Sequence, residues 1–268
     1  MTSKHIAIAT LALMLLPAAQ ALEPFAPYDK FSEKPLDPAR WVEGEQVRTI
    51  KGSGMQLMQR KLGLGGADSG LTFATFSTNL TAPSTINSLR ARITVNALEV
   101  NACASNPTVA QSRARIVGAL FNVNAAPTPG SMVGDVTAQV RITRFSNSAD
   151  PVGVLRVQGL ALLCTSVDCA AGTTIGNMVD LGTVNVGTAT VVQYQWDKAA
   201  KTFHFSRDQG AYAGTVGYAL SDTAPPSQAF HQLSTRLDLP NCLSAARVPG
   251  SVDAKFDNVA VNQSGAVR

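Results

Sequence analysis

The sequence predicts an all-β protein, in which two antiparallel sheets stack as a jelly-roll sandwich. Three observations lead to this prediction. Apolar and polar residues alternate with period two in many short segments. Turn-forming residues separate these segments at short intervals. Glutamate and lysine, which favour helices, are scarce, and all five glutamates precede residue 100.

Composition limits the class of protein further. The chain has 268 residues, of which 45% are hydrophobic and 15% charged, with a net charge of +4. These values are typical of a globular protein and exclude collagen-like and disordered chains. The small positive excess does not indicate a nucleic-acid partner. No linker or repeat is present, so one domain is expected.

The N-terminus has the features of a secretory signal peptide. Lys4 and His5 precede an apolar run over 6–16, and Ala19-Gln20-Ala21 is a small-x-small cleavage site. The apolar run is too short to span a bilayer, and no later segment is long and apolar enough to do so. We therefore expect a signal peptide at 1–21, a mature single-domain β-sandwich at 22–268, and a secreted or periplasmic location.

Export makes disulfides the expected state of the four cysteines. Cys164 and Cys169 are close enough to close a local loop, and Cys103 and Cys242 would then join early and late parts of the chain. Three pairings are open from the sequence. A metal site is not indicated, because Cys164 and Cys169 have no second close pair and no histidine nearby.

The expected strands follow one another along the whole chain. In 89–97, Leu89 and Ile93 fall on one face and Arg90 and Arg92 on the other. The segment 135–143 alternates in the same way. The other predicted strands are 46–50, 55–60, 71–77, 113–123, 153–163, 179–186, 214–220, 229–236 and 251–261, with two more inside 192–206.

The segment 192–206 predicts a hairpin. Tyr194 and Trp196 share an apolar face, residues 197–201 form the turn, and Phe203 and Phe205 return to the same face. Trp196 is thereby assigned to the core.

The last predicted strand changes parity. Ala254 and Phe256 are apolar at even positions, whereas Val259 and Val261 continue at odd positions. An extra residue near Asp257-Asn258 restores a single face, so we expect a β-bulge there.

Short motifs at both ends resemble the concanavalin A-like lectin/glucanase jelly rolls. Asp29-Lys30-Phe31-Ser32 and the segment 36–41, which ends in Trp41, are similar to the opening of those domains, and 254–261 looks like their closing strand. The chain as a whole also resembles secreted bacterial proteins. The resemblance implies two antiparallel sheets, one of them curved, with ligands on the concave face or its rim loops. Many members of the family bind or cleave polysaccharides.

The sequence lacks the motifs of the common hydrolases. No Glu-x-Asp-x-x-Glu run supplies paired carboxylates, and no Gly-x-Ser-x-Gly elbow is present. We therefore expect a non-catalytic module that binds a carbohydrate or another surface partner and requires no cofactor.

Arginines on alternating strands suggest where such a ligand would bind. Seven arginines lie between 85 and 160, against three acidic residues. Guanidinium and amide groups suit an acidic or hydroxyl-rich glycan, although arginine on an exposed strand also improves solubility. The predicted ligand-binding residues are Arg92, Arg115, Arg141, Gln139, Gln193, Gln195 and His204.

Three alternatives remain open from the sequence. A polysaccharide lyase acting on a uronate glycan would use His204, Arg141, Gln139 and Tyr212 or Tyr218, as the alginate-lyase type does. A structural envelope protein would need no ligand site. A structural Ca²⁺ would be held by Asp29, Asp253 and Asp257 if the terminal strands pair. The oligomeric state is not predicted.

Overall fold

The computed structural model describes residues 45–81 and 83–265. Regular structure in this part of the chain consists of strands and three 3-10 turns, at Pro83–Thr85, Asp208–Gly210 and Gln263–Gly265. No helix within the described ranges is long and apolar enough to cross a membrane. The predicted signal peptide, the opening motif at Asp29 and Trp41 all lie outside the described residues.

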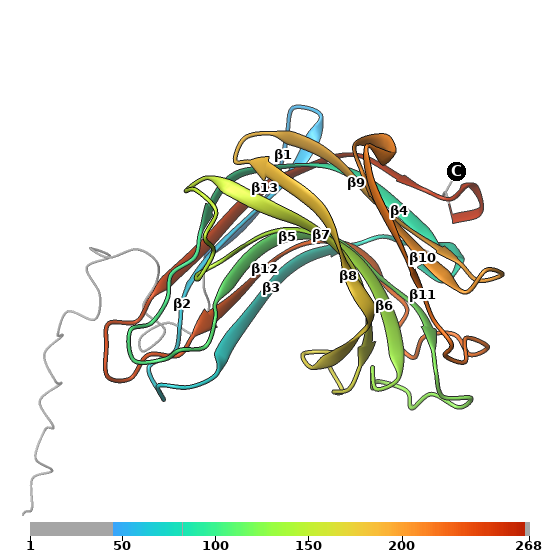
Figure 1. The fold of residues 1–268 in the computed structure, drawn as a ribbon, viewed down its shortest axis with the longest axis horizontal. Coiled ribbons are helices and arrows are strands. Elements are labelled where there is room, and N and C mark those ends of the chain that lie inside the picture. Colours follow the sequence, from blue (N-terminus) through green and yellow to red (C-terminus); the bar gives the residue numbers. More distant parts are fainter. Residues whose placement is uncertain (1–44, 82, 266–268) are drawn as a thin grey trace, which may run out of the picture. The chain divides into compact units, whose positions relative to one another are not determined.

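The strands form two antiparallel sheets (Figure 1). The seven-stranded sheet has the order β1 (Glu45–Lys51), β2 (Gly54–Leu62), β13 (Pro249–Val261), β4 (Ser88–Glu99), β9 (Ala189–Asp197), β10 (Thr202–Arg207) and β11 (Tyr212–Gly217). The six-stranded sheet has the order β3 (Leu71–Asn79), β12 (His231–Pro240), β5 (Gln111–Asn122), β6 (Asp135–Phe145), β7 (Val154–Cys164) and β8 (Gly172–Asn185). The two late strands β12 and β13 are each inserted between early strands, as in a jelly roll. The predicted two-sheet antiparallel sandwich is thus confirmed.

The core lies between the two sheets. Alternation sends Leu57, Ile93 and Phe256 inward from the seven-stranded sheet, and Ile116 and Val140 inward from the other. Each of these side chains is at most 1% exposed. Burying fully enclosed aliphatic and aromatic side chains contributes roughly 1.5–3 kcal/mol each, so this layer is the main source of stability. Figure 1 shows both sheets curved, with the six-stranded sheet on the inner side.

The predicted hairpin is β9 and β10, with Asp197 opposite Thr202 across the turn. Trp196 packs against the core and stacks on Phe121 with ring centroids 5.3 Å apart. Its assignment to the core is therefore confirmed.

The predicted bulge in the last strand is also confirmed. The register of β13 against β4 shifts between Asp257 and Ala260, and Asn258 has a φ of 48°. Asparagine is one of the few residues that adopts this left-handed conformation readily.

Of the three pairings left open by the sequence, the structure has the one in which the two nearby cysteines form a local loop and the other two join distant parts of the chain. Cys164 joins Cys169 over a separation of 5 residues, and Cys103 joins Cys242 over 139 residues. No described cysteine is free.

Candidate functional site

A cleft of about 570 Å³ lies on the face of the six-stranded sheet that points away from the core. Side chains of β3, β12, β5, β6 and β7 form its floor, and loops form its rim. This volume is within the range of small-molecule and cofactor sites.

The strand pattern of β5 explains how charged groups reach this floor. Ala114 and Ile116 point into the core, so the residues between and beside them, Arg113 and Arg115, point into the cleft. The register then places Arg236 of β12 opposite Arg113, and Arg141 of β6 opposite Arg115. Two pairs of like charges therefore face each other on neighbouring strands, an arrangement that is destabilising by itself.

The first pair is neutralised by an aspartate. Asp238 of β12 is only 2% exposed. Its carboxylate accepts a hydrogen bond from Nε of Arg236 at 2.6 Å and lies 3.0 Å from Nη1 of Arg113. Nε of Arg113 is buried and makes no hydrogen bond to a described residue. Arg113 is therefore ion-paired but not fully hydrogen-bonded.

The second pair is in contact only with neutral groups. Arg115 donates from Nε to the Ser234 hydroxyl at 3.0 Å and from Nη1 to Oε1 of Gln139 at 3.1 Å. Arg141 donates from Nε to Oε1 of Gln158 at 3.0 Å and contacts the Met178 sulfur at 3.4 Å. Neither guanidinium contacts a carboxylate of the described residues, so Asp238 acts on this pair only from a distance.

Burial makes this charge costly. Burial lowers the pKa of Arg113 to about 9 and that of Arg141 to about 10, and it lowers the pKa of Arg115 well below its usual value. Neighbouring guanidinium groups add to the lowering in each case, and Asp238 opposes it. A bound anion would act in the same direction as Asp238.

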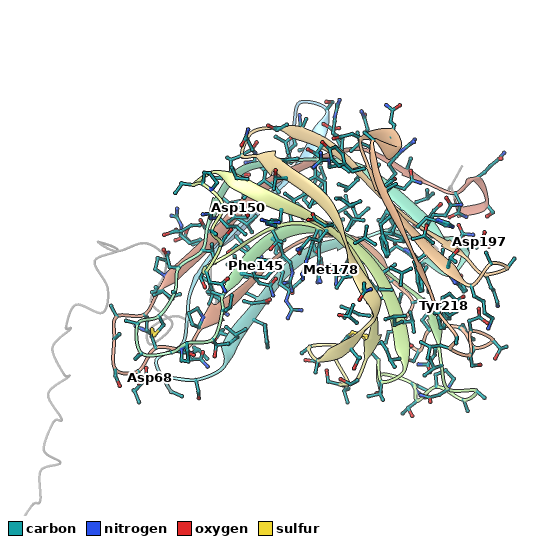
Figure 2. The ribbon with its side chains drawn as sticks, viewed as in Figure 1. Asp68, Phe145, Asp150, Met178, Asp197 and Tyr218 are labelled. Atoms are coloured by element: carbon teal, nitrogen blue, oxygen red, sulfur yellow. A yellow bond between two sulfur atoms is a disulfide. The ribbon has the colours of Figure 1, made fainter. Side chains whose placement is uncertain are left out.

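Apolar side chains flank the arginines. The Arg236 guanidinium lies over the Phe73 ring at 4.7 Å, and that of Arg141 lies 5.7 Å from the Phe145 ring. Phe145 and Met178, both labelled in Figure 2, each contact Arg141. The planar guanidinium groups are therefore held in fixed orientations.

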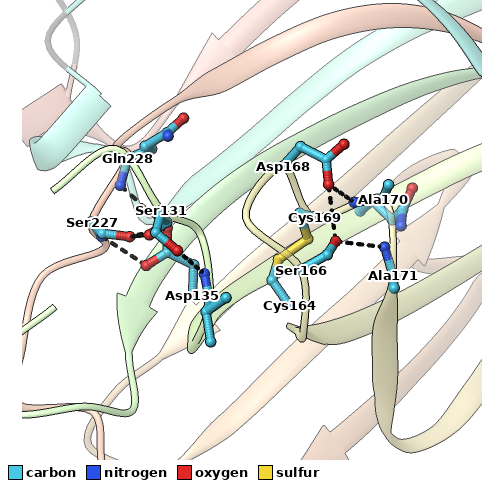
Figure 3. Close-up of a disulfide and its surroundings, with 12 residues drawn as sticks. Ser131, Asp135, Cys164, Ser166, Asp168, Cys169, Ala170, Ala171, Ser227 and Gln228 are labelled. Carbon is cyan, nitrogen blue, oxygen red and sulfur yellow. Dashed lines mark hydrogen bonds between the residues drawn. A yellow bond between two sulfur atoms is a disulfide. The ribbon is translucent and has the colours of Figure 1, made fainter. Parts of the chain in front are cut away.

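Three loops border the cleft, over 123–134, 165–171 and 218–230, and Figure 3 shows residues of each. One is the Cys164–Cys169 loop, in which Asp168 accepts the Ser166 hydroxyl at 2.9 Å and the Ala170 amide at 3.0 Å. These hydrogen bonds lower the pKa of Asp168.

The loop 218–230 is anchored by Asp135, the first residue of β6, which is fully buried. Its carboxylate accepts the amide of Ser227 at 2.7 Å, that of Gln228 at 3.2 Å and the side chain of Asn122 at 2.7 Å. The Met132 amide, in the loop 123–134, donates to the carbonyl of Val167 at 2.8 Å, which ties that loop to the Cys164–Cys169 loop.

The structure divides the predicted ligand-binding set. It brings Arg115, Gln139 and Arg141 together in the cleft. Arg92, Gln193, Gln195 and His204 lie instead on the outward face of the seven-stranded sheet, where they alternate with buried residues. The alternation of side chains identifies which residues of a strand point outward, but not the sheet to which the strand belongs. The expectation that these residues share one face is therefore wrong.

The outward residues of β4 and β10 have partners of their own. Arg92 donates to Asp257 at 2.5 Å, and this contact raises the pKa of Arg92. His204 is exposed and lies 2.9 Å from the Thr215 hydroxyl and 3.1 Å from that of Thr202. These contacts are those of an exposed strand surface.

The residues of the lyase alternative do not converge. Arg141 and Gln139 lie in the cleft, His204 lies on the other sheet, and Tyr212 of β11 stacks on Arg207 at 3.6 Å. Tyr218 is buried and donates to Asp222 at 2.6 Å, which together with burial raises its pKa to about 12. The described residues that line the cleft include neither histidine nor tyrosine.

The calcium alternative is left with two aspartates. Asp29 lies outside the described residues. Asp253 accepts the Gln56 amide at 2.7 Å, and Asp257 is paired with Arg92. Within the described ranges, no three His, Cys, Asp or Glu side chains cluster as metal ligands would.

Sequence reasoning missed several cleft residues. The predicted ligand-binding set does not include Arg113, Arg236 or Asp238, which line the cleft. It also omits Gln158, which accepts a hydrogen bond from Arg141. The alternation of Ser234, Arg236 and Asp238 with Leu233, Leu237 and Leu239 carried the signal. The predicted strand 229–236 stopped before Asp238, whereas β12 runs to Pro240.

Comparison with known proteins gives similarity to solved structures alone. No family model matches the chain, and no curated protein matches it. A family 18 polysaccharide lyase is 10% identical, with 80% of this chain and 82% of that chain covered and a TM-score of 0.39. A legume lectin-like domain from Entamoeba histolytica is 9% identical, with 89% and 99% covered and a TM-score of 0.36.

Two further structures have similar scores. A β-1,3-glucanase from Mycobacterium marinum is 15% identical, with 77% of this chain and 73% of that chain covered and a TM-score of 0.36. A sialidase is 11% identical over 81% of this chain with a TM-score of 0.38, and the chain spans only 16% of the sialidase's length. All four TM-scores are below 0.5.

Proposed function

We propose that the protein is an exported, non-catalytic module that binds an acidic polysaccharide in the cleft of the six-stranded sheet. The observation that carries this proposal is the opposed pair of Arg115, which is buried, and Arg141, which is half-buried, since neither contacts a carboxylate of the described residues. A carboxylate or sulfate group placed between them would offset their mutual repulsion and accept paired hydrogen bonds from the planar forks.

The surroundings of this pair support a sugar rather than a bare anion. The amides of Gln139 and Gln232 and the hydroxyl of Thr137 line the same floor and can exchange hydrogen bonds with sugar hydroxyls. Val117 and Leu162 offer apolar surface to the C–H faces of a sugar ring. Two disulfides are compatible with a location outside the cytoplasm.

The lyase alternative receives no support from the cleft. Proton abstraction beside a uronate needs a base within hydrogen-bond reach of the sugar. The acids that line the cleft, Asp168 and Asp238, are each engaged, the first by Ser166 and Ala170 and the second by two arginines. No histidine or tyrosine is found among the described lining residues.

Calorimetric titration with a soluble polyuronate and a neutral β-glucan tests the proposal. The polyuronate should bind and the neutral glucan should bind at least tenfold more weakly, since a charge-assisted hydrogen bond is worth about 1.5–3 kcal/mol. The double variant Arg115→Gln, Arg141→Gln should lose the preference. Arg48→Gln is the matched control, because Arg48 is an exposed arginine on β1 of the other sheet.

Equal binding of both polymers, or binding that survives the double substitution, would overturn the assignment of the cleft. Absorbance of an unsaturated product during incubation with polyuronate would overturn the non-catalytic part. The two results are independent, because one measures affinity and the other turnover.

A further inference from the structure

A second hollow lies on the opposite side of the sandwich, on the outward face of the seven-stranded sheet. It has a volume of about 320 Å³ and is lined by Arg90, Val191, Gln193, Ser206, Gln209 and Gly210. This volume is at the lower end of the range for ligand sites, so it suits a molecule smaller than one that fills the first cleft.

The floor of this hollow is one cross-strand row. Arg90 of β4 is opposite Gln193 of β9, and Gln193 is in turn opposite Ser206 of β10. A guanidinium, an amide and a hydroxyl therefore follow one another at the spacing of adjacent strands, about 4.8 Å.

The row differs from its neighbours because its side chains have no partner within the part of the chain that the structure describes. The side chains of Arg90 and Gln193 make no hydrogen bond or ion pair with any described residue, although Gln193 is half-buried. On adjacent rows, by contrast, Arg92 is paired with Asp257, and His204 lies beside Thr215. Unpaired donors and acceptors at this row are available to a ligand.

A strained turn forms the wall. Asp208, Gln209 and Gly210 have φ values of 50°, 58° and 93°, so three consecutive residues adopt the left-handed conformation that non-glycine residues rarely take. The Asp208 carboxylate holds the turn by accepting the Val191 amide at 3.1 Å and by pairing with Nε of Arg207 at 3.2 Å. No hydrogen bond or ion pair joins Asp208 to Arg90 among the described residues.

We propose that this hollow is a second binding site, independent of the cleft, for a free sugar acid. Its carboxylate would contact the Arg90 guanidinium, and its hydroxyls would contact the Gln193 amide and the Ser206 hydroxyl. The single unpaired charge and the small volume favour one acidic ring over a polymer.

Two-dimensional ¹⁵N–¹H NMR titration of the whole protein with D-glucuronate tests the site. We expect saturable shifts of the amides in 190–193 and 206–211. The dissociation constant should rise at least tenfold in Arg90→Gln, because a charge-assisted contact is lost. Gln193→Ala should weaken binding less, and Arg48→Gln should leave it unchanged.

Two further probes separate the contribution of the carboxylate from that of the hydroxyls. D-glucose lacks the carboxylate and acetate lacks the hydroxyls, so each should bind at least tenfold more weakly than glucuronate. Equal affinity for glucose or for acetate, the absence of shifts, or unchanged binding in Arg90→Gln would overturn the proposal. Repeating the titration in the Arg115→Gln, Arg141→Gln protein removes any contribution of the cleft, so failure at one site is distinguished from failure at the other.

Discussion

Arg115 of β5 and Arg141 of β6 are directly opposed in register, and neither guanidinium contacts a carboxylate of the described residues. Cross-strand pairs of like charge reduce the stability of a sheet, and this pair, unlike Arg113 and Arg236, has no aspartate in contact with it among the described residues. Such unfavourable pairs are expected at functional sites, where the missing partner arrives with the ligand.

Removing one of these charges should stabilise the free protein. Arg141→Gln ends the repulsion and keeps a group able to hydrogen-bond Gln158, so we expect a gain of roughly 0.2–1 kcal/mol. For a domain of this size that is a rise in Tm of up to about 4 °C. Differential scanning calorimetry measures it. Arg156→Gln is the control, because Arg156 is paired through two contacts with Asp150 and its loss should lower Tm. A lower Tm in Arg141→Gln would show that the pair is not in conflict.

A small divalent anion should stabilise the protein through the same pair. At ten times its dissociation constant, sulfate would add about 1.4 kcal/mol to the free energy of unfolding. The comparison is a thermal melt in sodium sulfate against sodium chloride of equal ionic strength. The extra stabilisation should vanish in the Arg115→Gln, Arg141→Gln protein. If it persists there, sulfate acts elsewhere or by exclusion from the surface.

The two disulfides should differ in their effect on stability. Cys103–Cys242 closes a loop of 139 residues and Cys164–Cys169 one of 5. Chain entropy assigns about 5 kcal/mol to the first and about 2 kcal/mol to the second. Urea unfolding of Cys103→Ser, Cys242→Ser and of Cys164→Ser, Cys169→Ser compares them. The local disulfide borders the cleft, so its removal should weaken polyuronate binding more than removal of the other does. A larger loss of stability without Cys164–Cys169, or a larger loss of polyuronate binding without Cys103–Cys242, would contradict these expectations.

Asp135 should control the order of the cleft rim. Asp135→Asn removes charge-assisted bonds to the amides of Ser227 and Gln228, each worth about 1.5–3 kcal/mol. We expect a loss of about 3 kcal/mol in stability and faster amide hydrogen exchange at these two positions. Asp180→Asn is the control, since Asp180 is exposed and accepts one backbone amide, that of Gly182, at 2.9 Å. Unchanged exchange at Ser227 would place the anchor of this loop elsewhere.

Much of the fold could be predicted from the alternation of side chains alone. The hairpin of β9 and β10 was predicted from Tyr194, Trp196, Phe203 and Phe205, and the bulge of β13 from the change of parity at Asp257. Both features depend on local spacing, which the sequence contains directly.

The site depends on which strands become neighbours, and that is not local. Arg92 and Arg141 both alternate with core residues, yet they lie on opposite sides of the sandwich. The register that sets Arg236 beside Arg113 joins positions more than a hundred residues apart. Such pairings follow from the packing of the whole core and cannot be obtained from any single segment.

Protonation of one buried histidine should control acid stability. His231 of β12 is 0% exposed, and its Nδ1 lies 2.6 Å from the Tyr194 hydroxyl of β9, so the contact joins the two sheets. Burial lowers the pKa of His231 from 6.5 to about 4, against a smaller opposing effect of the backbone at Ile86 and Pro83. Between these two pH values the His231 side chain binds a proton in the unfolded chain but not in the folded protein. The free energy of unfolding is therefore highest above pH 6.5 and decreases as the pH falls toward 4. The loss of stability over this window is about 3 kcal/mol.

Urea unfolding at pH 7, 6, 5 and 4.5 should show this decrease in the wild type. His231→Gln should be less stable than the wild type at pH 7, but its free energy of unfolding should change less with pH. His204→Gln, which alters an exposed histidine, should keep the wild-type slope. If His231→Gln retains that slope, another group causes the acid sensitivity, and the contact between Tyr194 and His231 does not couple the sheets to pH.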